Sequence, residues 1–519
     1  MIVAGGGPVP AQEAVQPPAM PAEELPAGSE VLAGGPVHEA FAKPVSMEAQ
    51  APIVVPKLPP QNVQEVPPAE RPAGAGIVWV PGYWAWDGQR NDFIWVSGCW
   101  RNAPPNTYWV PGHWLQAGNG WEWISGFWKP ITAQPAQEIE YLPAPPAPIE
   151  IEAPGAPPLP DQCWVPGCWY WHQGQYVRRH GYWMGQQIGW VWVPSHYVWT
   201  PRGYIFAAGH WDHDMDNRGV LFCPAFFPLD VRMRGGFVFS PGVCVDLGML
   251  RLNLFVYPRY RHYYFGDYYD DAYGRLGIVP WFKCQTIHTW YDPLFVYDRW
   301  HFRQTEPRWA ANQAREFELR HSNRDLRPAH TVVALQAQMA RLPANRRPER
   351  PLVESIKTYA VSQHTPIKFE RISTTERQQI AVKSADVHAL RDQRGQWEGT
   401  PGRPAPAVAA ASQHQAAPEP RTKAAAPEAP MAGRPTRSAR QPVSVPAREV
   451  RVTQPERVVV PVTPHTAQPS ASRYIEKQAP SHPVQESSHT SPAPSPRSPG
   501  GAAPARPGPA DSRTPNRQR

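Results

Sequence analysis

The chain has 519 residues, of which 68 are proline, and 41% of its residues are hydrophobic. So much proline excludes a packed core along the whole length, and we expect less than about two-thirds of the chain to be globular. The net charge of +7 resides in the C-terminal tail, so it does not favour nucleic-acid binding by the folded part. No apolar run is long enough for a membrane-spanning helix.

Residues 1–76 are rich in Pro, Ala, Val and Glu, and acidic residues outnumber basic ones there. This composition predicts a disordered acidic leader. An N-terminal export signal is not visible, because the first residues lack a basic segment followed by an apolar core. The stretch "PVPAQEA" is compatible with a cleavage region in a chain whose start lies further upstream.

Hexads of the form Trp-x-x-Gly-x-Trp dominate the next part of the chain. Most start 14 residues apart, which indicates one supersecondary unit repeated, with neighbours burying one another's faces. They define a first repeat block at residues 77–128, a Pro-rich linker at 129–161, and a second block at 162–300 that includes a Tyr-rich β extension. The hexads start at Trp79, Trp95, Trp109, Trp123 and Trp164, and decayed copies start at Arg178, Trp192 and Phe206.

The Pro-Gly and Ser-Gly steps inside the hexads predict chain reversals, because proline followed by glycine suits the centre of a type II turn. A reversal at Pro111 and Gly112 pairs Trp109 with Trp114, and a second reversal at "AGNG" pairs Trp114 with Trp123. The tryptophans then form a ladder, in which each aromatic pair contributes about 0.5–1 kcal/mol. The alternative is one long strand that passes through each Pro-Gly step as a bulge. In either layout the second apolar face needs a cover, which packing of the two repeat blocks supplies.

The predicted fold class is therefore mainly β: an antiparallel meander of short Trp-rich hairpins, then a smaller α-helical region at 301–398, with long disordered arms. The stretches "EPRWAANQAREFELRHSNRDL" and "TVVALQAQMARL" have the apolar spacing of amphipathic helices. Ser373 and Glu376 form a capping box that opens a helix running to about Trp397. Residues 399–519 are basic and rich in Pro, Ala and Ser, which predicts a disordered tail.

The hexads and their flanking steps, in "YWAWDG", "WEWISGFW" and "CWYWHQGQ", resemble the WXXGXW, or YXWGXW, repeat proteins of bacteria. The resemblance continues through "HYVWTPRGYIF", "RYRHYYFGDYYDDAYG" and "HTWYDP" to "KFERISTTERQQIAV", and so covers residues 77–398. It implies an extracytoplasmic protein, since the members are mostly exported. The family has no assigned activity, so the resemblance implies no catalytic residues. The decayed copies at 178 and 206 and the missing signal depart from the family pattern.

Motifs of catalysis or metal binding are absent or incomplete. The chain has no P-loop, Gly-rich dinucleotide turn, GxSxG elbow or HExxH motif. Asp212, Asp214 and Asp216 have the spacing of a calcium loop, but Asn217 and Cys223 stand where that loop needs Gly and Glu. We interpret this segment as a polar hairpin tip, and the acids of "GDYYDDAY" as solvated surface. We therefore predict no enzyme, no cofactor and no metal site.

The cysteines and histidines of the hexads leave two further expectations. The six cysteines form no CxxC motif, so zinc and thioredoxin-type sites are unsupported. A disulfide between Cys163 and Cys168 and a set of separate buried thiols remain equal alternatives. His113, His196 and His210 share the fifth hexad position with Tyr, Phe and Cys, a mixture that predicts a tolerant, partly exposed position.

These observations favour a non-enzymatic structural or adhesive protein of the bacterial cell envelope, in which the Trp-ladder sheet is a rigid body between two arms. The alternative is a module that binds a glycan or cell-wall polymer, with sugar rings stacked on exposed Trp84, Trp114, Trp169 and Trp211. Its partner would be an anionic polysaccharide, since the tail is basic. Nucleic acid is the least favoured partner, because the basic charge is thinly spread. The exposure of the indoles discriminates between the first two functions.

Overall fold

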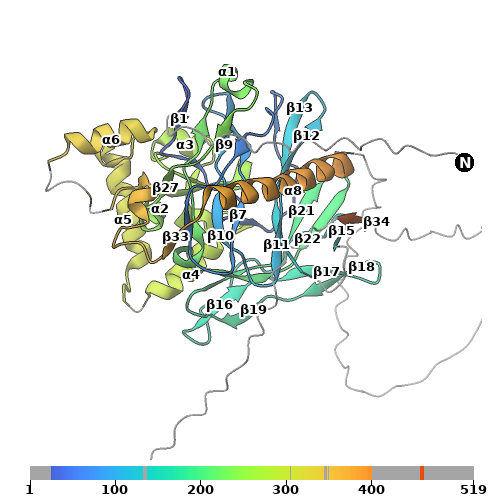
Figure 1. Ribbon diagram of the computed structural model, residues 1–519. Helices are drawn as coiled ribbons and strands as arrows, with labels where there is room; N and C mark the ends of the chain where they lie inside the picture. The colour runs from blue at the N-terminus through green and yellow to red at the C-terminus, as the bar shows by residue number, and fades with distance from the viewer. Residues whose placement is uncertain are drawn as a thin grey trace, which may run out of the picture. The chain divides into compact units, whose positions relative to one another are not determined.

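The repeats fold into four hairpins, each built from two hexads (Figure 1). The computed structural model describes residues 25–131, 137–303, 305–343, 348, 350–399 and 456–460. Hairpin 1 comprises β7 (Ile77–Val80), β8 (Tyr83–Asp87), β9 (Asp92–Val96) and β10 (Cys99–Asn102); hairpin 2 comprises β11 (Thr107–Val110), β12 (His113–Ala117), β13 (Gly120–Ile124) and β14 (Phe127–Pro130); hairpin 3 comprises β16 (Gln162–Val165), β17 (Cys168–His172), β18 (Gln175–Arg179) and β19 (Tyr182–Gly185); hairpin 4 comprises β20 (Trp190–Val193), β21 (His196–Thr200), β22 (Gly203–Ala207) and β23 (His210–His213).

Within each hairpin the two outer strands pair with each other, and the two inner strands pair with each other, in one continuous register. In hairpin 2, Trp109 lies opposite Trp128 on the outer strands, and Trp114 lies opposite Trp123 on the inner strands. The other three hairpins have the same arrangement. The chain therefore reverses only in the short loop between the inner strands.

This register corrects the predicted reversal at the Pro-Gly steps, which would have paired Trp109 with Trp114. The predicted pair of Trp114 and Trp123 is confirmed. The structure adopts the alternative layout, in which the chain continues through the Pro-Gly step. Proline is tolerated there because Pro111 and Gly112 lie in a gap between the two ladders, so no strand loses a donor.

Residues 25–76 belong to the fold, whereas their composition predicts disorder. They form six short strands, of which β4 adds to β13 of hairpin 2, and Val37, Ala40 and Phe41 are buried. Each of these short strands pairs with a strand from a later part of the chain, which ties the segment into the fold. Residues 1–24 lie outside the described residues. The six strands are β1 (Glu30–Val31), β2 (Gly35–Pro36), β3 (Val45–Ser46), β4 (Val54–Val55), β5 (Gln64–Glu65) and β6 (Glu70–Pro72).

Short strands and helices alternate after hairpin 4, and the Tyr-rich stretch forms the buried pair β28–β29. The strands are β24 (Gly219–Val220), β25 (Ala225–Phe226), β26 (Val238–Phe239), β27 (Val243–Val245), β28 (Leu254–Tyr257), β29 (His262–Phe265), β30 (Val279–Pro280), β31 (Trp290–Tyr291), β32 (Val353–Ser355) and β33 (Phe369–Arg371). The helices are α1 (Leu229–Arg232), α2 (Leu247–Leu252), α3 (Asp271–Arg275), α4 (Pro293–Phe302), α5 (Trp309–Ser322), α6 (Val332–Arg341), α7 (Ile356–Tyr359) and α8 (Thr374–Gly399), with 3₁₀ turns η1 (Met215–Asn217), η2 (Pro258–Tyr260), η3 (Trp281–Thr286) and η4 (Arg324–Leu326).

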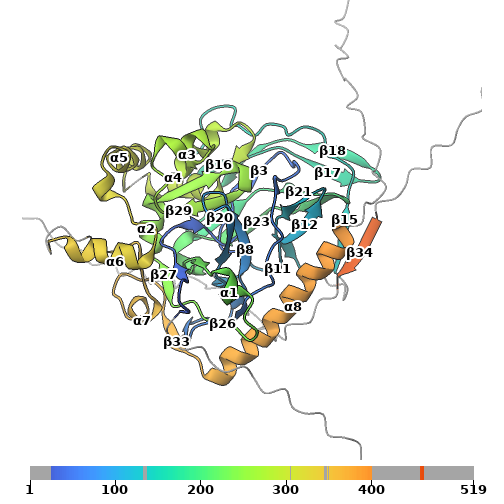
Figure 2. The same ribbon diagram turned by 90° about the horizontal axis from the view of Figure 1, so that it is seen from above.

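The predicted helices are confirmed, and the last of them has a structural role that its sequence does not predict. The Ser373 and Glu376 capping box opens α8 as expected. Figures 1 and 2 show α8 running along the repeat hairpins, where it contacts β7, β11 and β12. No helix of the described residues is long and apolar enough to cross a membrane.

The core joins the two repeat blocks, as predicted. Val110 and Phe127 of hairpin 2 pack with Val198 and Ile205 of hairpin 4 in one buried cluster. The linker contributes to this cluster through Ile139 of β15 (Gln137–Tyr141), which pairs with β34 (Glu456–Val460). Apart from β34, the predicted C-terminal tail beyond residue 399 lies outside the described residues.

Candidate functional site: the glycine pairs of the repeats

The middle of each hairpin is a glycine pair, by which we mean the two Gly-containing hexad steps that face each other between the ladders. In hairpins 1 and 2 each glycine lies against the first tryptophan of the opposite hexad. A Cβ atom added to Gly126 would lie 2.4 Å from Cζ2 of Trp109, and one added to Gly112 would lie 2.5 Å from Cζ2 of Trp123. The hexad therefore needs glycine because any side chain would displace an indole. The same contact joins Gly82 with Trp95, Gly98 with Trp79, Gly181 with Trp164 and Gly209 with Trp192.

A buried carboxylate occupies the glycine pair of hairpin 1. Glu65 Oε2 accepts a hydrogen bond from the backbone N–H of Gly82 at 2.9 Å, and Oε1 accepts one from Gly98 at 3.0 Å. Oε1 also accepts from the indole N–H of Trp95 at 3.0 Å. Because the ladder is open here, these backbone donors have no strand partner, and a buried donor without a partner is costly. Glu65 thus completes the hydrogen bonding that the Pro-Gly step interrupts.

Hairpin 2 has the same feature, supplied by a different segment of the chain. Glu39 Oε2 accepts from the N–H of Gly126 at 2.9 Å, and Oε1 accepts from the indole N–H of Trp123 at 3.0 Å. Trp123 and Trp95 are both the first residue of the second hexad in their hairpin. The first tryptophan of that hexad therefore has two roles, since its ring covers a glycine and its N–H binds the carboxylate.

Hairpins 3 and 4 show how the decayed hexads keep this arrangement. In hairpin 3, Glu150 accepts from the N–H of Gly181 at 2.6 Å, and Arg178, which replaces the tryptophan, also binds Glu150. In hairpin 4, Ser195 stands at the position of the first glycine, and its Oγ accepts from the N–H of Gly209 at 2.8 Å. A hydroxyl within the repeat thus takes the place of the external carboxylate.

Cationic side chains bind the carbonyl groups of the same glycine pairs. Arg391 of α8 donates to the carbonyls of Gly112 at 3.1 Å and Gly82 at 3.2 Å, and so joins hairpins 1 and 2. Arg394 of α8 donates to the carbonyl of Pro111 at 2.5 Å and pairs with the buried Glu398 at 2.9 Å. Helix α8 therefore satisfies the acceptors of the glycine pairs, as Glu39 and Glu65 satisfy their donors.

The burial of these ions shifts their titration. Burial raises the pKa of Glu65 to about 7, although its hydrogen bonds from Gly98, Trp95 and Gly82 oppose the rise. Burial also lowers the pKa of Arg391 to about 10. The side chain of Glu65 therefore changes its protonation near neutral pH. Its three bonded donors and its place beneath the indoles give it a structural role.

The tryptophans predicted to bind glycans are all engaged in the fold. Trp84 is 2% exposed and its N–H donates to the carbonyl of Gln61, so neither ring face is open to a sugar. Trp114, Trp169 and Trp211 are half-buried. The N–H of Trp114 donates to the carbonyl of Trp84, and that of Trp169 to the carbonyl of Ala147. The structure thus separates Trp84, a core residue, from three rings with partly open surface.

The acids at the calcium-like spacing have separate partners. Asp212 is buried and pairs with Arg101 and with Arg218 at 2.8 Å. Asp214 caps η1, and Asp216 pairs with Arg251 at 2.9 Å. The three carboxylates thus bind different protein groups. The predicted polar hairpin tip is wrong for this segment, because Asp212 lies on the outer strand β23 and both Asp212 and Asp214 are buried.

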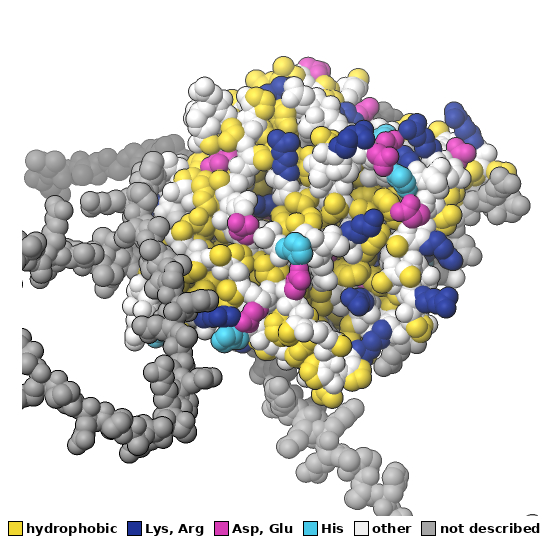
Figure 3. Space-filling view, turned by 180° about the vertical axis from the view of Figure 1, so that it is seen from behind, with side chains coloured by type: hydrophobic (Ala, Val, Ile, Leu, Met, Phe, Trp, Pro, Cys, Tyr) yellow, Lys and Arg dark blue, Asp and Glu magenta, His cyan; other side chains and the backbone are white. Residues whose placement is uncertain are grey.

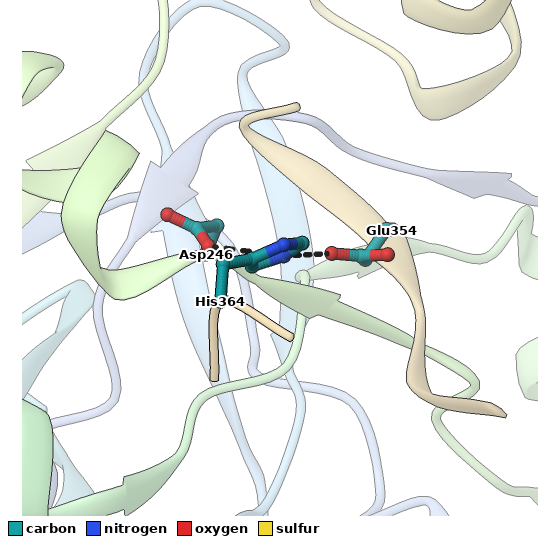
Figure 4. A group of neighbouring side chains, drawn as sticks. All are labelled: Asp246, Glu354 and His364. Carbon is teal, nitrogen blue, oxygen red and sulfur yellow. Dashed lines mark hydrogen bonds and ion pairs between the residues drawn. The ribbon is translucent and has the colours of Figure 1, made fainter. Parts of the chain in front are cut away.

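One cluster in the described residues has the composition of a metal site. His364 Nε2 lies 3.0 Å from Glu354 Oε1 and 3.7 Å from Asp246 Oδ2, between the two carboxylates (Figure 4). Arg350 already binds the same Asp246 oxygen at 2.8 Å, and Asp246 Oδ1 caps α2 through the N–H of Met249. A cation would have to compete with the guanidinium, so the cluster is a structural ion network that fastens residues 350–364 to α2.

The structure tests two expectations about the hexad side chains, and of the two alternatives for the cysteines it bears out separate buried thiols. All six cysteines are free and buried, so Cys163 and Cys168 form no disulfide. They lie on β16 and β17, on either side of a step where the chain continues in one direction. The fifth hexad position, predicted to be partly exposed, is buried at His113 (2% exposed) and His196 (8% exposed), whereas His210 is half-buried. Burial, with Arg394 and Arg391 nearby, holds the pKa of His113 well below its usual value, so this residue is a neutral core side chain.

Sequence reasoning missed the acids and cations that complete the glycine pairs. Glu39, Glu65 and Glu150 come from Pro-rich segments interpreted as leader or linker. Their one signal is a single acid among apolar residues and proline, as in "QEVPP". Arg391 and Arg394 lie one turn apart on α8, a spacing that many solvated helices share. The pattern within the hexads does not show which distant segment supplies these partners.

The sequence matches to a known repeat agree with the pairing of hexads in the hairpins. The family model of the WXXGXW repeat, which spans two hexads, matches residues 74–101, 108–129, 160–184 and 188–212. Each match coincides with one of the four hairpins. This chain carries WXXGXW repeats. One match of the repeat thus corresponds to one hairpin and one glycine pair. Comparisons with curated proteins and with solved structures found no match.

Proposed function

We propose that this WXXGXW repeat protein is a non-enzymatic structural protein of the bacterial cell envelope. The observation that carries the proposal is the use of the repeats as core. The indoles cover glycines, and the buried acids and cations bind backbone groups of the glycine pairs. Ionisable groups used in this way hold together segments that are distant in sequence, as a rigid structural protein requires.

The proposed location outside the cytoplasm rests on the family resemblance, since the similar repeat proteins are mostly exported. The described residues contain no membrane-spanning helix. The basic region beyond residue 399 supports an anionic polymer as the partner, because opposite charges attract over several ångströms.

Complementation of a deletion strain tests this function. We expect the deletion to make the envelope sensitive to detergent, and the wild-type gene to restore resistance. The double variant Glu354→Ala and His364→Ala, which removes the most catalysis-like cluster, should restore resistance as well as the wild type when its fold is intact. Failure of this folded variant would indicate chemistry at that cluster, and location of the protein in the cytoplasmic fraction would contradict an envelope role.

A further inference from the structure

A cleft of about 590 Å³ lies between hairpin 3 and helix α4. Trp164 and Trp183 form one wall and Trp300 contributes to another, while Tyr291 and Phe295 are buried beneath. A volume of this size is in the range of small-ligand sites. Figure 3 shows that hydrophobic side chains also gather on the outer surface of the molecule, with Lys and Arg side chains among them.

The rings in this cleft are more open than those at the same positions of hairpin 1. Trp164 and Trp183 face each other across the outer strands, with ring centroids 5.3 Å apart and planes at 66°. Both are half-buried, whereas their counterparts in hairpin 1, Trp79 and Trp100, are buried. An edge-to-face pair leaves ring surface on which the C–H face of a sugar can stack.

Two of the residues that line the same cleft have a buried polar atom without a partner. The indole N–H of Trp300 and Oε1 of Gln162 are buried, and within the described residues neither has a hydrogen-bond partner. One is a donor and the other is an acceptor, so a ligand that satisfies both must accept and donate. Hydroxyl groups do both. The walls thus combine aromatic surface for stacking with polar groups that hydroxyls can bind.

Two arginines give the cleft a positive charge. Arg299 and Arg303 lie one turn apart at the C-terminal end of α4, and neither has an ion-pair partner among the residues that the structure describes. Arg303 lies over the ring of Trp300 at 5.6 Å. The only acid that lines the cleft in the described chain, Glu152, is paired with His288 at 2.5 Å. A planar guanidinium binds a carboxylate in two parallel hydrogen bonds.

We propose that this cleft binds an acidic oligosaccharide, with sugar rings stacked on Trp164 and Trp183 and a uronic carboxylate at Arg299 and Arg303. The hydroxyls of the sugar satisfy Trp300 and Gln162. The proposal does not depend on the structural function above, because the cleft uses ring faces and charges that the glycine pairs leave free. It places a glycan site at the edge of hairpin 3, apart from the predicted stacking residues, of which Trp84 is buried and Trp114, Trp169 and Trp211 are half-buried.

Calorimetric titration of the full chain with tetragalacturonic acid and with neutral cellotetraose tests the proposal. We expect the acidic tetramer to bind at least about tenfold more tightly, as charge-assisted hydrogen bonds predict. The double variant Arg299→Gln and Arg303→Gln should lose this preference. The matched control Arg275→Gln and Arg315→Gln removes the same charge from exposed positions outside the cleft and should keep it.

A second variant addresses the wall without changing the charge. Trp300→Phe keeps an aromatic ring at this position and removes the indole N–H. It should weaken binding of the acidic tetramer by roughly threefold to tenfold. Absence of binding at millimolar tetragalacturonic acid would overturn the proposal. Equal losses in the two double variants would also overturn it, since they would show attraction to net charge alone, and unchanged affinity in the cleft variants would place binding elsewhere.

Discussion

At the scale of single residues, the WXXGXW hexad is explained by reciprocal packing. The first tryptophan covers the glycine of the opposite hexad, and in the second hexad of hairpins 1 and 2 its N–H also binds the carboxylate that holds the glycine N–H. The fifth position points into the core, as His113 and Phe127 show. Tryptophan is required because it provides both a large apolar ring and a hydrogen-bond donor.

The packing of glycine under indole predicts a large effect of one methyl group. Gly126→Ala should lower the free energy of unfolding by about 2 kcal/mol, because its Cβ would clash with Trp109 and with backbone atoms. Gly155→Ala is the matched control, since a Cβ there meets nothing within 4 Å. Chemical denaturation of both variants measures the difference. Equal stability of the two would contradict the packing account.

The raised pKa of Glu65 predicts a pH dependence of stability. Its pKa is about 7 in the folded state against 4.5 for an ordinary glutamate, so between these values the folded state binds more protons than the unfolded state. The free energy of unfolding should therefore fall by about 1 kcal/mol per pH unit as the pH rises from 5 to 7. Glu65→Gln should remove the part of the slope that Glu65 contributes, whereas buried Asp292, whose pKa burial also raises to about 7, should keep its own contribution. Denaturation curves at several pH values test this, and an unchanged slope in the variant would assign it to another group.

At the scale of elements, α8 acts as a clamp on hairpins 1 and 2. The capping box predicts where α8 begins. The amphipathic pattern of α8 is weak, because this helix contacts the hairpins through arginines. Arg391 satisfies two carbonyls that no strand can reach. The pairing of the inner strands is predictable, because the loops between them have ordinary turn composition. The pairing of the outer strands is not, because a Pro-Gly step fits a turn and a gap between two ladders equally well. The deciding partner, Glu65 or Glu39, is remote in sequence.

Replacement of Arg391 tests the clamp. Arg391→Met should lower the free energy of unfolding by about 2–4 kcal/mol, because the carbonyls of Gly82 and Gly112 would be left buried without a donor. Lys383→Met removes the same charge from an exposed position on the same helix and should have little effect. Thermal unfolding followed by near-ultraviolet circular dichroism compares the two. A similar small loss in both variants would mean that α8 merely covers the surface.

At the scale of the whole molecule, the repeats depend on segments outside them. Mainly β structure, the helical region and the packing of one repeat block on the other follow from the hexads and from amphipathic spacing. The folding of residues 25–76 does not follow, because composition reports the average content of a segment and not the single acid that it delivers to a buried site. Glu39 and Glu65 make this Pro-rich segment part of the core.

Truncation tests this dependence directly. A chain that begins at residue 77 lacks Glu39 and Glu65, so the donors of Gly82, Gly98 and Gly126 would be buried without partners, and we expect loss of cooperative unfolding. A chain that begins at residue 25 should unfold like the full chain. Calorimetry distinguishes the two. Cooperative unfolding of the shorter chain at the wild-type temperature would show that the repeats fold alone.

The central claim is that carboxylates from distant segments complete the glycine pairs, and amide hydrogen exchange at Gly82, Gly98 and Gly126 tests it most directly. The account predicts that these three amides are protected as strongly as those of the neighbouring strands. In Glu65→Gln, exchange at Gly82 and Gly98 should accelerate more than at Gly126, which Glu39 binds. Exchange at the rate of an open loop in the wild-type chain, or equal acceleration at all three glycines, would contradict the account.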